Sequence, residues 1–342
     1  MKDSRLSELS LLDGLRLLAS FVIVGHHMGG EPLMGIRFGV PLFLVIMFGL
    51  ASRSTRAEPL TAYAKRKGLY LLTPWLRWSL FYIIVLGLAD VLRGGEAFSR
   101  VEPEMLFYGG HPALWFLPFA AAALVPARGL QSLANQIAPA RAALCLAGTA
   151  ALLTIAVAWL IQFPMPDMPV RLWLKFVPAI FWGLAIGQSA RAGKGRERSL
   201  LLMTVASSVI LSGVLIEVAG LPTTQAHGFT VAVLLAALGF GLRTTLPPSI
   251  RRLSGTTFGV YLLHPIIGKA LVTVADVASW NAVVHTSVVW LTSYFGVLIL
   301  RSLGLPFHEL GKRVVTSTHV ATRPVALPHQ LGPQVERPKK AA

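Results

Sequence analysis

The 342-residue sequence has little cysteine, few acidic residues and few charges of any kind. Its single cysteine, Cys145, excludes an internal disulfide and a cysteine-based zinc cluster, and its place in an apolar run predicts a small core filler. Only 13% of the residues are charged, 54% are hydrophobic, and the mean hydropathy is +0.64. These proportions exclude an ordinary soluble domain and predict a chain that crosses a membrane several times.

Several catalytic signatures are also missing. The sequence has no Walker-type glycine loop, no dinucleotide fingerprint, no HExxH motif and no G-x-S-x-G serine elbow. On a helix the adjacent rings of His26 and His27 point about 100° apart, a poor chelating pair, so we expect no metal site. The net charge of +16 does not predict nucleic-acid binding, because the basic residues are dispersed among short loops.

Apolar runs long enough to span a bilayer recur along the chain, which predicts an all-α, polytopic membrane bundle. The first run has a mixed-charge flank and no small-residue cleavage site after it, so we expect it to stay in place as a helix. We predict a transmembrane domain over 1–305 and a basic, proline-containing, disordered tail over 306–342. The ten predicted transmembrane helices lie near residues 11–28, 36–52, 69–91, 112–128, 142–163, 172–190, 199–220, 228–242, 256–275 and 282–303.

Basic residues alternate between the predicted loops. The loops on one side hold fourteen of them, whereas those on the other side hold four: Arg37, Arg93, Arg100 and Arg171. By the positive-inside rule, this asymmetry predicts that both termini are cytoplasmic. The fourteen are Arg53, Arg56, Lys65, Arg66, Lys67, Arg128, Arg141, Arg191, Lys194, Arg196, Arg198, Arg243, Arg251 and Arg252.

The first predicted helix, "LLDGLRLLASFVIVGHHM" over 11–28, carries polar side chains near both ends. From Arg16 to His27 is eleven residues, about three turns plus 20° and a rise of about 16 Å, so both side chains share one face. Arg16 suits an anionic ligand such as a phosphate, and His27 can accept a proton from a hydroxyl and return it. The alternative is an arginine that only obeys the positive-inside rule and a histidine that only bonds a carbonyl.

The same segment resembles the opening helix of the membrane acyltransferase 3 family, in which a leucine-aspartate-glycine-leucine-arginine run precedes a histidine at this spacing. Three further similarities follow in the family's order: "GVPLF" at 39–43, "LWFLPF" at 114–119 and "YLLHP" at 261–265. The resemblance implies about ten transmembrane helices and transfer of an acyl group, commonly acetyl from acetyl-CoA, to a carbohydrate hydroxyl. It also implies that His27 is essential and that Arg16 lies close to the path of the acyl donor.

The sequence departs from the family pattern at two places. Met47 and Phe48 stand where the family usually has a serine-glycine pair, which predicts an altered helix contact. In "AKRKGLYLLTPWLRW" the second of two family arginines is replaced, and Arg77 is a candidate for the missing charge. Its alternative role is a snorkelling or ion-paired arginine.

We therefore expect a bacterial inner-membrane O-acyltransferase that uses acyl-CoA as donor and a carbohydrate or glycolipid as acceptor, with membrane lipids around it and no bound cofactor. His27 is the predicted general base or transient acyl carrier. The predicted donor-binding residues are Arg16, Arg66, Lys67 and Arg77, and the predicted cavity-lining residues are Asp13, His111, Trp115, Tyr261 and His264. The alternative function is a transporter or flippase of a sugar or lipid-linked intermediate, although no repeat of interrupted helices supports it.

Overall fold

The computed structural model describes residues 10–29, 37–53, 58–92, 94–96, 101–164, 167–192, 195–242, 244, 246–275 and 280–303. These residues form helices and connecting turns, with no strand among them. The predicted tail at 306–342 lies outside the described residues. In chain order the helices are α2 Ser10–His27, α4 Gly39–Ser52, α5 Leu60–Leu92, α6 Met105–Tyr108, η1 Pro112–Trp115, α7 Phe116–Ala134, α8 Pro139–Leu160, η2 Asp167–Arg171, α9 Leu172–Arg191, α10 Arg196–Val218, α11 Thr224–Gly241, α12 Pro248–Ser254, α13 Thr257–Ala275 and α14 Ala282–Ser302.

Each of the ten predicted segments coincides with one of these helices. Within the described part of the chain, seven helices are long and apolar enough to cross a membrane: α5, η1 with α7, α8, η2 with α9, α10, α11 and α14. The apolar helices α4 and α13 are shorter, and α2 is not among the seven. The all-helical class is confirmed, while the count of ten spans and the orientation of the termini stay predictions.

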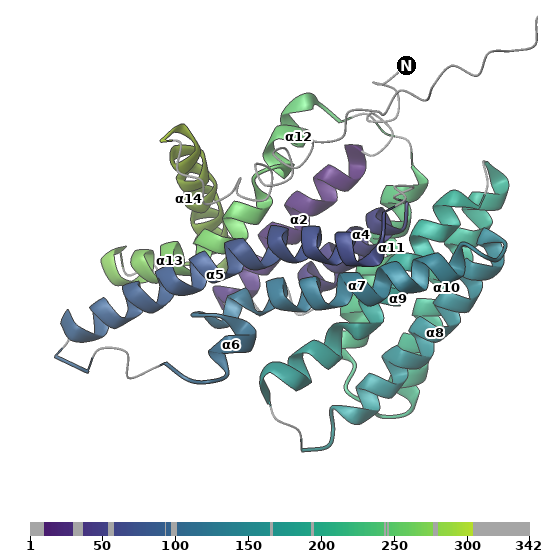
Figure 1. Cartoon of the computed structure of the whole chain (residues 1–342), viewed down its shortest axis with the longest axis horizontal. Coiled ribbons are helices and arrows are strands. Elements are labelled where there is room, and N and C mark those ends of the chain that lie inside the picture. Colours follow the sequence, from purple (N-terminus) through teal and green to yellow (C-terminus); the bar gives the residue numbers. More distant parts are fainter. Residues whose placement is uncertain are drawn as a thin grey trace, which may run out of the picture.

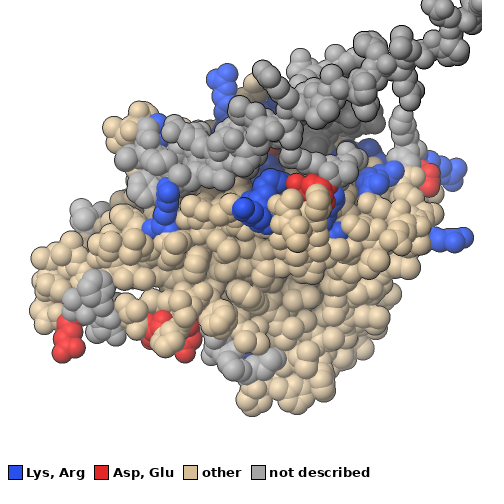
Figure 2. All heavy atoms as spheres, in the orientation of Figure 1, with Lys and Arg blue, Asp and Glu red and all other residues tan. Residues whose placement is uncertain are grey.

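Helices α5 and α7 lie side by side across the middle of the view in Figure 1, and α8 packs against α10 at the right. At one end of the bundle, Arg191 near the close of α9 and Gln131 on α7 both donate hydrogen bonds to the carbonyl oxygen of Ser52, the last residue of α4. We call this the basic end, because Lys and Arg line the corresponding upper edge of the surface in Figure 2. The opposite end holds the end of α2 and the start of α4, and we call it the His27 end.

Helix α2 lies in the middle of the bundle. It contacts α4, α11, α12, α13 and α14, and Leu12, Ala19 and Val24 along it are almost fully buried. Asp13 lies in its first turn, where a carboxylate complements the positive end of the helix dipole. The structure therefore fixes both the position and the rotation of the helix that carries Arg16 and His27.

Small residues allow α4 and α9 to approach closely. A Cβ atom on Gly183 would lie 2.6 Å from the Cβ of Phe48 and 2.7 Å from the carbonyl oxygen of Val45. The bulky Phe48 is fully buried opposite this glycine. The departure from the family's serine-glycine pair is thus accommodated by a glycine on the facing helix.

The prediction that Cys145 fills the core is wrong. Cys145 is exposed on α8. An apolar run places a residue in a membrane helix but does not say which face of that helix meets other helices, because lipid-facing positions are apolar too.

The close contact of α4 and α9 predicts that Gly183→Ala destabilises the protein, because the added methyl group forces the two helices apart. We expect a loss of about 1–3 kcal/mol, the usual cost of overpacking, seen as a lower midpoint of thermal unfolding in detergent. Gly148→Ala on α8 is the matched control, since a Cβ there would meet nothing within 4 Å. Equal midpoints for the two variants would contradict the proposed packing.

Candidate active site

His27, the last residue of α2, lines a cavity of about 440 Å³ at the His27 end. Its side chain is exposed, so a ligand in this space can reach the imidazole. We call this space the His27 cavity. Its walls come from α2, α4, η1, α9, α11, the residue that follows α8 and the segments that precede α4 and α11: Val22, Ile23, His26, His27, Arg37, Gly39, Val40, Pro41, Pro112, Trp115, Ile161, Leu172, Lys175, Phe176, Pro222, Thr224 and Gln225.

A buried histidine lies beside His27. The ring centroids of His27 and His264 are 5.1 Å apart, and His264 is fully buried on α13. Because Pro265 has no N–H, the Tyr261 carbonyl cannot receive its usual helical hydrogen bond. The Nδ1 atom of His264 lies 2.7 Å from that carbonyl oxygen and donates to it.

This bond decides the chemistry of the other ring nitrogen of His264. A proton on Nδ1 leaves Nε2 of the neutral ring with a lone pair. Nε2 is buried and has no hydrogen-bond partner among the described residues. It is therefore an acceptor that lies next to His27 and suits an N–H of the His27 ring.

A third histidine, His111, forms the N-terminal cap of η1. Its ring stacks on Tyr82 of α5 with centroids 4.8 Å apart, and its Nδ1 accepts a hydrogen bond from the backbone N–H of Ala113. Burial, and secondarily the charge of Lys269, lower the pKa of His111 to about 4, so the ring is neutral at pH 7. His111 lines a second cavity of about 630 Å³, which we call the His111 cavity.

Two glycines bring His111 to this position. A Cβ atom on Gly110 would lie 2.2 Å from the carbonyl oxygen of Ser79, so only glycine allows the loop to lie against α5 at this point. Gly109 has a φ of 87°, a backbone conformation that glycine adopts at no steric cost. The loop thus holds His111 against Tyr82.

Tyrosine hydroxyls join α13 to its neighbours. Tyr261 donates to the carbonyl oxygen of Ala113 in η1, and Tyr82 donates to that of Leu262 over 2.9 Å. Both tyrosines are buried. These bonds fix α13, and with it His264, against α5 and η1.

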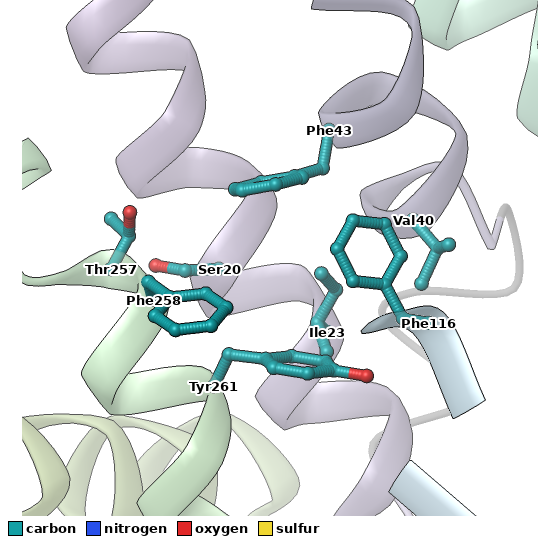
Figure 3. Close-up of a pocket in the computed structure, with 8 residues that line it drawn as sticks. All are labelled: Ser20, Ile23, Val40, Phe43, Phe116, Thr257, Phe258 and Tyr261. Atoms are coloured by element: carbon teal, nitrogen blue, oxygen red, sulfur yellow. The ribbon is translucent and has the colours of Figure 1, made fainter. Parts of the chain in front are cut away.

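A cluster of aromatic rings fills the space between the two ends of the α2 face. Ser20 and Ile23, which lie on the face shared by Arg16 and His27, point toward Phe43, Phe116, Phe258 and Tyr261 (Figure 3). We call these four rings the aromatic plug. The void that they enclose measures only about 10 Å³, room for about one water molecule.

Arg16 lies at the basic end with Asp13. Their side chains are 3.5 Å apart, and Asp13 also accepts a hydrogen bond from Ser254 over 3.0 Å and lies 3.9 Å from Arg251. Asp13 therefore orients Arg16. It was predicted to line a cavity, but it is not among the residues that line the His27 cavity.

Arg66 and Lys67 form a second cationic group at the start of α5. Arg66 pairs with Glu58, and both cations lie over the ring of Tyr63, at 5.4 Å and 5.9 Å from its centroid. Arg128 of α7 lies over the same ring, at 5.7 Å. The structure brings these three cations together around one buried tyrosine.

Arg77 lies apart from this group. It is exposed on α5, on the outward side that also exposes Leu80 and Ile84. Of the predicted cavity-lining residues, Trp115 lines the His27 cavity, His111 lines the His111 cavity, Tyr261 belongs to the aromatic plug and His264 is fully buried.

Sequence reasoning missed Arg37 and Lys175 as residues of the site. Arg37 was counted only among the basic residues of the loops. Lys175 could have been found, because it lies within a predicted transmembrane segment, where a charge is costly and often functional. Tyr82 gave no signal, because an apolar helix often contains a tyrosine for packing alone.

The helices and the site together are those of a helical membrane protein. Three histidines, His27, His264 and His111, lie near two cavities, and cations gather at the basic end. Residues 9–303 match the acyltransferase 3 family model, described as an acyltransferase domain. The chain therefore belongs to the membrane acyltransferase 3 family, as the resemblance of its first helix implies. Membership favours acyl transfer over the transport alternative. No curated protein and no solved structure matches the chain.

Proposed function

We propose that the protein transfers an acyl group, acetyl in the simplest case, from acyl-CoA to a hydroxyl of a cell-surface carbohydrate or glycolipid in the bacterial inner membrane. Family membership supports acyl transfer. The observation that carries the chemistry is the closeness of accessible His27 to buried His264, with ring centroids 5.1 Å apart, where the Nε2 atom of His264 has no hydrogen-bond partner among the described residues.

In the proposed reaction His27 acts as general base. One ring nitrogen donates its N–H to Nε2 of His264, which leaves the other nitrogen with a lone pair toward the His27 cavity. This nitrogen takes the proton of the acceptor hydroxyl while the hydroxyl oxygen attacks the thioester carbonyl. The C–S bond then breaks, and the leaving thiolate receives the proton from His27.

The proposed bond from His27 to His264 favours the role of general base over that of a transient acyl carrier. An imidazole that is fixed by one hydrogen bond and open to the cavity at the other nitrogen suits repeated proton transfer. His264 is a positioning residue in this scheme, because it acts on the reaction through His27.

We further propose that the cations at the basic end hold the phosphates of acyl-CoA. Coenzyme A carries a diphosphate and a 3′-phosphate, and the Arg16 group and the Arg66–Lys67 group provide two separate cationic sites. The pantetheine chain of the donor then runs along the face of α2 that carries Arg16 and His27, where it displaces rings of the aromatic plug to reach His27. Arg77 is left out of this site because of its outward position.

The first prediction about activity is that His27→Gln lowers transfer of label from radioactive acetyl-CoA to surface glycans by at least about 100-fold, the usual contribution of a general base. Membranes with equal amounts of wild-type and variant protein are compared. His26→Gln is the matched control, since His26 lines the same cavity but its ring lies 5.6 Å from that of His27 and has no proposed role. A His27→Gln rate within tenfold of wild type would contradict the mechanism.

The second prediction separates the two nitrogens of His264. An asparagine amide replaces Nδ1 and keeps a donor for the Tyr261 carbonyl, whereas a glutamine amide places an acceptor near the position of Nε2. We expect His264→Asn to lower kcat by about 10- to 100-fold with little change in KM, and His264→Gln to restore part of the loss. Similar kcat values in both variants, or a change in KM alone, would show that His264 only supports the fold.

The third prediction concerns the donor. Arg66→Gln and Lys67→Gln should each raise KM for acetyl-CoA by about tenfold, because a bond to a charged phosphate is lost, and should leave kcat nearly unchanged. Arg77→Gln is the control from the same helix and should change neither constant. If KM rises only in Arg77→Gln, the donor binds elsewhere.

A further inference from the structure

The aromatic plug lies on the line that joins the two ends of α2. Arg16, Ser20, Ile23 and His27 are four, three and four residues apart, so they follow one face of this helix. Ser20 and Ile23 line the small void that the plug rings enclose (Figure 3). An acyl group that moves along this face from the basic end to His27 therefore has to pass the plug.

The described residues that line this void include no charged side chain. Three of them carry a hydroxyl group: Ser20, Thr257 and Tyr261. The other five side chains are apolar, and they are those of Ile23, Val40, Phe43, Phe116 and Phe258. Polar contacts for a group inside the plug can therefore come only from the three hydroxyls of this lining.

Each of these hydroxyl groups already uses its hydrogen. Ser20 and Thr257 each donate to a backbone carbonyl three residues earlier in the chain, over 2.8 Å. Tyr261 donates to the carbonyl of Ala113, and Ser20 also accepts a hydrogen bond from the indole of Trp290 over 3.0 Å. Because a hydroxyl has one hydrogen, no hydroxyl donor remains for a ligand among the described residues of this lining.

This lining affects a charged and an uncharged acyl group differently. A carboxylate that leaves water needs a cation or hydrogen-bond donors to compensate its charge. The described lining supplies neither, so passage of a carboxylate is costly. An uncharged acyl group makes no such demand, and its methylene groups exchange water for contact with apolar side chains.

We propose that the aromatic plug selects the acyl donor by charge: it admits uncharged acyl groups and rejects acyl groups that carry a free carboxylate. This inference rests on the proposed function, from which it takes the route of the donor along α2. The transfer step is unchanged: the acceptor oxygen bonds to the acyl carbon, the C–S bond breaks, and the thiolate receives the proton from His27.

Pairs of donors with equal size and different charge test the proposal in membranes that contain the wild-type protein. Butyryl-CoA and malonyl-CoA carry acyl groups of nearly equal size, as do valeryl-CoA and succinyl-CoA, and only the second member of each pair has a free carboxylate. With the label in the acyl group, we expect the uncharged member to be transferred to surface glycans at least about 100-fold faster. Rates within tenfold in both pairs overturn the proposal. Transfer of acetyl without transfer of butyryl also overturns it, because size then decides at this length.

Competition shows where a charged donor is rejected. Malonyl-CoA has the same phosphates as acetyl-CoA, so it should bind at the basic end although its acyl group does not pass the plug. We expect unlabelled malonyl-CoA to raise the apparent KM for labelled acetyl-CoA and to leave kcat unchanged. If malonyl-CoA neither donates its acyl group nor inhibits, the rejection occurs before the plug and the proposal is overturned.

Variants of the two half-buried plug rings locate the selection. Phe43→Ala and Phe258→Ala enlarge the void, and water held by the three hydroxyl oxygens can then accompany a carboxylate. Each variant should raise the ratio of malonyl to butyryl transfer about tenfold, and this ratio does not depend on the amount of protein. Phe181→Ala is the matched control, since Phe181 is half-buried on α9 and is not among the residues that line the void.

A ratio that stays at the wild-type value in both plug variants overturns the proposal. Phe43→Leu and Phe258→Leu, which keep most of the packing, replace an alanine variant that no longer transfers butyryl. The same assay separates this inference from the proposed function. If no acyl-CoA is a donor, acetyl-CoA included, the proposed function fails and the inference with it, whereas equal transfer of charged and uncharged groups overturns the inference alone.

Discussion

The packing of α2 against five other helices is the constraint on which the site depends. One helix face carries Arg16 near the basic end and His27 at the other end, and α2 packs against α4, α11, α12, α13 and α14. The middle of that face must be filled, since an empty space among helices forfeits packing contacts. The aromatic plug fills it and at the same time separates the two ends.

Pro265 determines which ring nitrogen of the neighbouring His264 carries the proton. Pro265 leaves the Tyr261 carbonyl without its helical donor, and a buried carbonyl without a donor is costly. His264 satisfies it through Nδ1, which fixes the tautomer and turns Nε2 into a buried acceptor. The local irregularity of α13 and the chemistry proposed for His27 thus have one cause, and both lie within the sequence YLLHP.

The sequence was sufficient to predict the helices and the common face of Arg16 and His27, because hydropathy and the 3.6-residue period act within one segment. It could not predict which faces of different helices meet. Cys145 therefore lies at the surface, although it was expected in the core. Arg77 is also exposed, away from the other residues predicted to bind the donor. Arg37 and Lys175 are far apart in sequence, and only tertiary packing brings them to the cavity that His27 lines.

The distribution of charge bears on how the two proposed substrates meet. In the proposed scheme the cations that hold the phosphates of acyl-CoA lie at the basic end of α2, whereas the acceptor binds at the His27 end. The void within the plug is only about 10 Å³ and its walls are almost wholly apolar, so the phosphates of the donor cannot follow the thioester through it. Only the uncharged pantetheine chain can enter when the rings move, which keeps the phosphates at the basic end. In the proposed scheme the same rings must also accommodate the acyl group, so the size of the plug side chains would limit which acyl groups reach His27.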